Sequence, residues 1–246
     1  MQGGDAASMK LPTRLSTEPL VEVICETRFD AASDSAVNLL PGILHEALGP
    51  FEHQHRLISL PPQMLAVDAA FAVQPQIRLS QKNLAIQIGA RTVSVLYQPP
   101  YPGWSDFSAY VQRVFDVVCK QSFITGFNWL SLKYIDLLQI GASPRISWLN
   151  AENSLGGRRL DAEPQSMRVE YVEPPWTTVT QIVCPAQRVD SQEDGLLVDV
   201  DVIYRRPFDD FRNQYRDVLR ELHQRNKAQF FSLLTDETLA KLGPEY

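Results

Sequence analysis

The chain has 246 residues, 44% of them hydrophobic and 21% charged, and its 29 acidic and 23 basic residues give a net charge of −6. This composition is typical of a soluble globular protein and excludes collagen-like, coiled-coil, disulfide-scaffold and wholly disordered chains. The acidic balance argues against a general polyanion binder, although it is compatible with a local basic face. A chain of this length buries a core that is stable without metal, so we expect no cofactor.

The cellular location is predicted from what the sequence lacks. Uncharged stretches such as Gln121–Leu132 are shorter than the roughly 18 apolar residues of a membrane-spanning helix. The opening MQGGDAASMK has neither the basic nor the apolar region of a secretory signal. Cys25, Cys119 and Cys184 are odd in number and far apart among apolar residues, which favours reduced, buried thiols. We therefore expect a cytoplasmic protein without membrane association.

The first half of the chain predicts a strand, a helix, a meander of short strands and a long helix. Residues 1–18 have no apolar period and are expected to form a flexible arm. Alternation from Pro19 to Phe29 predicts a half-buried strand, and Ser35–Leu48 predicts a helix that Pro41 shortens or kinks. Short alternating runs follow at Arg56–Leu60, Ala70–Ser80, Leu84–Ile88 and Thr92–Tyr97. The apolar stripe of the long helix is Phe107, Tyr110, Val111, Val114, Phe115 and Val118.

The second half predicts the same order of elements. Asn128–Ile140 is expected to be a long strand, and Ile146–Asn153 is expected to contain a short helix. Three more strands follow, at Met167–Glu173, Thr177–Cys184 and Leu196–Arg205. The last long helix has its apolar stripe at Phe211, Tyr215, Val218, Leu219 and Leu222.

The two halves match when the chain is shifted by 104 positions. Phe107 then falls on Phe211, and the strand Thr92–Tyr97 falls on Leu196–Asp201. This match predicts an internal duplication. The alternative is a chance likeness, because two amphipathic helices that each follow a strand resemble one another.

The predicted fold is α+β, with two tandem β-α-(antiparallel β meander)-α units at residues 19–123 and 124–246. Their helices are expected on one face of a twisted antiparallel sheet, with both units packed as one domain. Such an arrangement leaves the other face of the sheet free to bind a partner.

Five segments, in this order, resemble those of one protein family. They are PLVEVICETRF at Pro19–Phe29, YPGWSDF at Tyr101–Phe107, LKYID at Leu132–Asp136, VDVD at Val198–Asp201, and a tail from Leu222-His223 to FFSLLT at Phe230–Thr235. The chain resembles a sporadically distributed family of uncharacterised bacterial and archaeal proteins of similar length. It differs from that pattern by being short between Leu48 and Phe71 and in its ending at Gly243–Tyr246. The resemblance implies scattered, horizontally moved genes, as defence and toxin–antitoxin genes often are, and supplies no catalytic residues.

Three aspartates form a candidate metal site. Asp199 and Asp201 lie two apart on a predicted strand, so both carboxylates project from one face. Together with Asp136 from another strand they have the ligand types that Mg²⁺ prefers in phosphoryl-transfer sites. The alternative is a surface row paired across strands with Lys133 or Arg205.

Aromatic residues in proline-rich segments form a candidate binding rim. Trp104 follows Gln98-Pro-Pro-Tyr-Pro-Gly, and Trp176 follows Glu173-Pro-Pro. Both rings are candidates to line a ligand site, whereas the alternative for Trp104 is packing against the first turns of its own helix. His223 lacks a nucleophile at catalytic spacing, so we expect a structural imidazole on the flank of the last long helix.

The last long helix carries a basic ladder. Arg212, Arg216 and Arg220 recur every four residues and therefore share one helix face. Like charges at this spacing repel one another, so we expect carboxylates from a neighbouring loop or subunit beside them. The alternative partner is the phosphate backbone of a nucleic acid.

The sequence favours a non-catalytic binding or regulatory protein that holds a protein partner or a second copy of itself. The alternative is a nucleic-acid-directed protein or metal-dependent nuclease accessory that uses the three aspartates and the arginine-rich helix. No glycine-rich phosphate-binding motif is present.

Deleting residues 1–8 is predicted to leave the melting temperature unchanged, because the segment has no apolar period with which to dock. Differential scanning calorimetry of the full-length and shortened chains checks this. A fall of several degrees would show that the segment is structural.

Overall fold

The computed structural model describes residues 11–32, 36–58, 69–188 and 194–246. Within these ranges, nine strands form one antiparallel sheet in the order β10-β11-β12-β7-β2-β6-β5-β4-β3. Their bounds are β2 Leu20–Ala31, β3 His53–Arg56, β4 Ile77–Gln81, β5 Leu84–Ile88, β6 Thr92–Tyr97, β7 Ile124–Leu138, β10 Gln165–Glu173, β11 Trp176–Gln187 and β12 Asp194–Tyr204. The α+β class and the large antiparallel sheet predicted from the sequence are confirmed.

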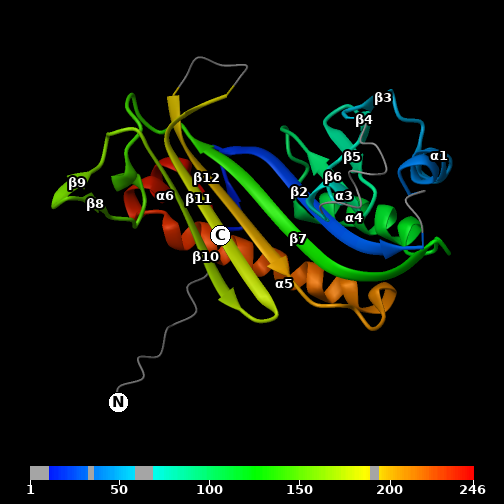
Figure 1. The fold of residues 1–246 in the computed structure, drawn as a ribbon. Coiled ribbons are helices and arrows are strands. Elements are labelled where there is room, and N and C mark those ends of the chain that lie inside the picture. Colours follow the sequence, from blue (N-terminus) through cyan, green and yellow to red (C-terminus); the bar gives the residue numbers. More distant parts are fainter. Residues whose placement is uncertain (1–10, 33–35, 59–68, 189–193) are drawn as a thin grey trace.

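Two long helices accompany this sheet. α4 begins at Trp104 and α5 at Phe211, and α5 lies across β7 and β12. In Figure 1 the strands β10, β11, β12 and β7 pass in front of α5. The helices are α1 Ala36–Leu48, α3 Ala69–Ala72, α4 Trp104–Val118, α5 Phe211–Leu233 and α6 Asp236–Leu242, with a 3₁₀ turn η1 at Ile146–Trp148. No helix of the described residues combines the length and the apolar character that crossing a membrane requires.

Alternation along the central strands separates two faces of the sheet. Leu132 lies opposite Val202, and both side chains are completely buried. Their neighbours Lys133 and Asp201, also opposite each other, project from the other face. The side-chain amide of Asn226 on α5 donates to the carbonyls of Leu132 and Val200. α5 therefore covers the apolar face of β7 and β12.

The strands are arranged alike on the two sides of the central β2–β7 pair. β6, β5 and β4 follow outward from β2, and β12, β11 and β10 follow outward from β7. Phe107 of α4 and Phe211 of α5, which are matched by the shift of 104 residues, are both buried. The duplication itself stays a prediction.

Proline accounts for one difference from the predicted elements. The run Ala70–Ser80, predicted as one strand, divides into α3 and β4, and Pro75 lies between them. Proline has a fixed φ and no N–H to donate to a ladder, so the strand begins only after it. α1 instead runs on to Leu48 with Pro41 inside it.

The two ends of the described chain meet in a small sheet. β1 (Arg14–Leu15) pairs with β13 (Pro244–Glu245), and a second small sheet pairs β8 (Asn153–Leu155) with β9 (Arg158–Leu160). The backbone N–H of Ser16 donates to the carbonyl of Gly243 at 2.9 Å. This part of the predicted flexible arm is thus held by the C-terminal residues, while residues 1–10 lie outside the described ranges.

Gly243→Ala is predicted to destabilise the protein by about 1 kcal/mol or more, because Gly243 has a φ of 64° and a Cβ there would collide with the Ser16 hydroxyl. Gly42→Ala is the matched control, since Gly42 lies inside α1 with nothing within 4 Å of its added Cβ. The control is expected to be neutral or stabilising by up to about 1 kcal/mol. Urea unfolding of both variants measures the difference, and equal effects would contradict it.

Candidate functional site

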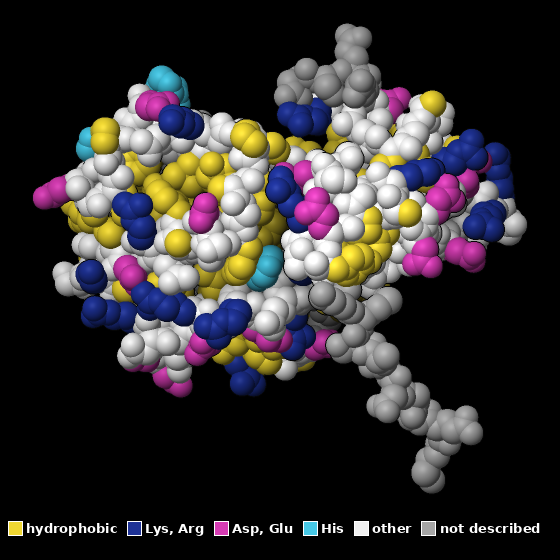
Figure 2. All heavy atoms as spheres, turned by 180° about the vertical axis from the view of Figure 1, so that it is seen from behind, with side chains coloured by type: hydrophobic (Ala, Val, Ile, Leu, Met, Phe, Trp, Pro, Cys, Tyr) yellow, Lys and Arg dark blue, Asp and Glu magenta, His cyan; other side chains and the backbone are white. Residues whose placement is uncertain are grey.

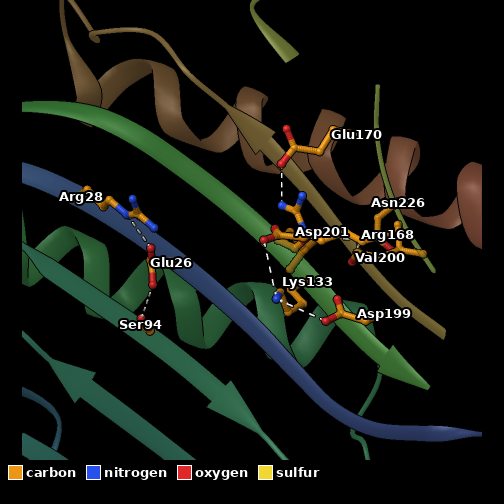
Figure 3. A network of polar contacts seen from close by, with 11 residues as sticks. Glu26, Arg28, Ser94, Lys133, Arg168, Glu170, Asp199, Val200, Asp201 and Asn226 are labelled. Atoms are coloured by element: carbon orange, nitrogen blue, oxygen red, sulfur yellow. Dashed lines mark hydrogen bonds and ion pairs between the residues drawn. The ribbon is translucent and has the colours of Figure 1, made fainter. Parts of the chain in front are cut away.

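Asp199 and Asp201, two of the predicted metal ligands, flank a lysine on the face of the sheet away from α5. The Lys133 ammonium lies 3.3 Å from Asp199 Oδ2 and 3.8 Å from Asp201 Oδ2. Figure 3 shows Lys133 between the two carboxylates. Burial raises the pKa of Asp201 to about 6, although Lys133 opposes the shift. The cation that these aspartates hold is a side chain of the protein itself.

Asp136, the third predicted ligand, projects from the opposite face. It lies opposite Val198 on β12, and Val198 alternates with Asp199. On β7, Lys133 and Asp136 are three residues apart, so their side chains point to different faces. The three carboxylates are therefore not brought together, and no group of three His, Cys, Asp or Glu side chains within the described ranges is arranged to hold a metal.

The arginine ladder of α5 has carboxylate partners. Arg216 Nη2 donates to both carboxylate oxygens of Asp116 on α4, each at 2.7 Å. Arg220 pairs with Asp217 of its own helix at 2.9 Å. Arg212 is exposed, and its carbonyl accepts a hydrogen bond from Arg216. Figure 2 shows Lys and Arg side chains along the lower part of the molecule, over α5. The partners come from α4 and α5 themselves, where a loop or subunit was expected.

The two predicted aromatic rim residues lie on different flanks of α5. Trp104 stacks on His223 with ring centroids 3.9 Å apart and planes 4° from parallel. The guanidinium of Arg225 lies over Trp176, with its Cζ atom 4.7 Å from the centroid of the tryptophan ring. Residues 223 and 225 are about 200° apart around a helix, so the two tryptophans do not share one rim. The structure places Trp104, but not Trp176, next to the cavity described below.

A cavity of about 160 Å³ lies between α5, β7 and the segment that leads into β2. Asp136 and Tyr134 of β7 form one wall. The other lining residues are Arg14, Leu15, Glu18, Pro19 and Leu20 before and at the start of β2, Tyr101 before α4, and His223, Asn226, Lys227, Phe230 and Phe231 of α5. The wall before β2 is the segment that the C-terminal strand β13 holds in place.

A chain of polar contacts runs along one side of the cavity. The hydroxyls of Tyr101 and Tyr134 are 3.1 Å apart, and the Tyr134 hydroxyl is 3.4 Å from His223 Nδ1. Burial, together with the charge of the nearby Lys227 ammonium, lowers the pKa of His223 to about 4. The imidazole is therefore neutral at neutral pH. His223 lies on the flank of α5, as the sequence predicted, in contact with Trp104 and Tyr134, and its structural role stays a prediction.

Asp136 is the buried acidic group of the cavity. Asp136 is 6% exposed. Within the described ranges, no hydrogen bond or ion pair joins its carboxylate to another residue. Burial, together with the charges of Glu18 and Asp199, raises its pKa to about 8. Burial also raises the pKa of Glu18, which Arg14 opposes, and lowers that of Lys227. A cavity with titratable groups of shifted pKa is the usual form of a binding site.

The cavity was not predicted from the sequence, although most of its lining residues belong to the segments that carry the family resemblance. Pro19 and Leu20, Tyr101, Tyr134 and Asp136, His223, and the Phe230–Phe231 pair come from four of the five segments that carry the family resemblance. Only the VDVD segment contributes nothing to the lining. The convergence of these segments was the available signal, but it needed the three-dimensional arrangement to be seen.

Comparison with protein-family models found no match, and comparison with curated proteins found none either. The resemblance to the sporadically distributed family therefore stays a prediction.

Asp136→Asn is predicted to stabilise the protein, and more at pH 8 than at pH 5. The folded pKa of Asp136 is about 8 against 3.8 for the free group, so folding takes up a proton between these values and stability falls as the pH rises through them. Asparagine removes this cost, which is on the order of a few kcal/mol at pH 8. Urea unfolding at both pH values measures the gain, with exposed Glu46→Gln on α1 as the control. An equal gain at both pH values would contradict the assignment.

Proposed function

We propose that the chain is a non-catalytic binding or regulatory protein and that it takes up a small ligand in the cavity beneath α5. The observation that carries the proposal is Asp136, a buried carboxyl on the cavity wall with no partner among the described residues. A buried polar group without a partner costs free energy. A ligand that reaches this wall supplies the missing contact.

The size of the cavity supports a small organic ligand. Its volume of about 160 Å³ is close to that of engineered protein cavities that admit benzene, about 150 Å³. Apolar lining from Leu15, Leu20, Phe230 and Phe231 lies beside the polar groups. An apolar wall with a few placed polar groups is typical of ligand pockets.

The chemistry of the lining supports binding without catalysis. No serine, threonine or cysteine is among the described residues that line the cavity. His223 has a pKa of about 4 and is stacked on Trp104, so it is poorly suited to accept a proton near neutral pH. Burial raises the pKa of the Cys25 thiol, which keeps that group protonated.

The alternative, a nucleic-acid-directed protein or nuclease accessory, draws less support from the same contacts. Arg216 and Arg220 are paired with carboxylates, and Asp136 faces away from Asp199 and Asp201. A protein partner, self-association and a cytoplasmic location stay predictions from the sequence, as does the link to defence or toxin–antitoxin genes. We also propose a tandem origin for residues 19–123 and 124–246, which the matching strand order supports.

Leu15→Trp is predicted to abolish ligand binding, because the larger ring would occupy the cavity that Leu15 lines. The control is Leu39→Trp at an exposed position of α1. In saturation-transfer NMR with a fragment library, wild type and the control are expected to bind shared fragments that Leu15→Trp does not. Binding that survives in Leu15→Trp, or a library without hits, contradicts the proposal.

The same proteins test the alternative by titration with labelled single- and double-stranded oligonucleotides. Binding is expected to be undetectable at physiological salt. If wild type binds with a steep salt dependence that Arg212→Gln together with Arg220→Gln removes, the nucleic-acid function replaces the one proposed here.

A further inference from the structure

No side chain of the described residues is hydrogen-bonded to the Asp136 carboxyl, and the amide and hydroxyl groups that line the cavity with it are engaged elsewhere. Both side-chain hydrogens of Asn226 go to backbone carbonyls, at 3.0 Å to Leu132 and 2.7 Å to Val200. The hydroxyls of Tyr101 and Tyr134 contact each other, and Tyr134 also contacts His223. None of these groups donates to Asp136, so its carboxyl is open to a donor that a ligand supplies.

The charges near Asp136 favour a cationic donor. Glu18 lines the same cavity and its charge acts on Asp136, so two acidic groups face the region. The charges of the two basic lining residues affect other groups. Arg14 lowers the pKa of Glu18, and Lys227 lowers the pKa of His223. A positive charge beside Asp136 would thus be attracted by the carboxyl groups of Asp136 and Glu18. No basic residue of the described chain pairs with both of them.

Aromatic rings complete the surroundings of this position. Tyr101, Tyr134, Phe230 and Phe231 line the cavity, and Tyr101 and Tyr134 meet edge to face with centroids 6.2 Å apart. Ring faces attract ammonium groups, and aromatic walls with a carboxylate are a recurring way to bind organic cations. The cavity as a whole, at about 160 Å³, accepts a body about the size of one benzene ring.

We propose that the cavity beneath α5 binds a small primary amine, with the ammonium group on Asp136 and the apolar body against the aromatic rings. This inference rests on the proposed function, because it names the ligand class of the same site.

The proposal has a pH signature. Asp136 has a pKa of about 8 and is therefore mostly protonated at neutral pH. An ammonium ligand that binds the carboxylate form displaces the proton of Asp136. Affinity is then expected to fall by up to roughly tenfold for each pH unit below the pKa. The titratable and charged groups around Asp136 are Arg14 and Glu18 before β2, Tyr101 before α4, Tyr134 of β7, Asp199 of β12, and His223 and Lys227 of α5.

Isothermal titration calorimetry with benzylamine, n-butylamine, benzyl alcohol and benzoate tests this inference on the full chain at pH 6 and pH 8. Wild type and the control Glu46→Gln are expected to bind both amines more tightly at pH 8, with proton release, and to bind the alcohol and benzoate at least tenfold more weakly. Asp136→Asn is expected to lose at least tenfold in amine affinity together with the pH dependence. Its folding is monitored by the stability measurement described above.

Two results would overturn the inference while leaving the proposed function intact. One is binding of benzyl alcohol or benzoate as tight as that of benzylamine, when Leu15→Trp abolishes it. The other is no binding by any of the four probes while the fragment library finds ligands of this cavity. Failure of the probes and of the library together would overturn the ligand class and the proposed function alike.

Discussion

The pairing of β2 with β7 is the contact on which the rest of the molecule depends. These two long strands join the halves of the sheet, and every other strand of the sheet extends outward from one of them. The pairing sets Val23 opposite Tyr134 and Leu20 opposite Asp136. The chain enters β2 beside Asp136, so the segment before β2 forms a wall over a carboxyl that β7 directs towards α5. The cavity is a consequence of where two long strands begin and end.

The acidic side chains on the two faces of this sheet have different surroundings. On the face away from α5, Asp199 and Asp201 share Lys133, which lies directly opposite Asp201. On the covered face, Asp136 is buried on the cavity wall, and no ion pair joins it to a basic residue of the described chain. The first arrangement stabilises charges that the fold already contains. The second leaves a buried carboxyl without a partner among the described residues, which is the observation that supports the proposed binding role.

Local periodicity was enough to predict the long strands and the two long helices but not their meeting points. Alternation identified β2, β7 and β12, and helical spacing identified α4 and α5, because each pattern lies within one continuous segment. The spacing of Asp199 and Asp201 correctly placed them on one face. The face of Asp136 depends on the register between β7 and β12, which one strand alone does not encode. The partner of Arg216 on α4 depends likewise on how two helices pack.

The candidate site was missed for the same reason. Its lining comes from four regions of the chain, and Tyr101, Tyr134 and His223 meet across 33 and 89 sequence positions. Each region reads locally as a strand edge, a loop or a helix flank. Only the segments that carry the family resemblance include residues from all of these regions. Those segments contain no information about the distances between the regions in the fold.

The small sheet between β1 and β13 ties the site to the far end of the chain. Pro244 and Glu245 pair with Arg14 and Leu15, which line the cavity, so β13 supports this part of the cavity wall from behind. Thermodynamic linkage works in both directions. If the cavity takes up a ligand as proposed, a substitution that frays the pairing of β1 with β13 would weaken its binding, and a bound ligand would in turn stabilise that pairing.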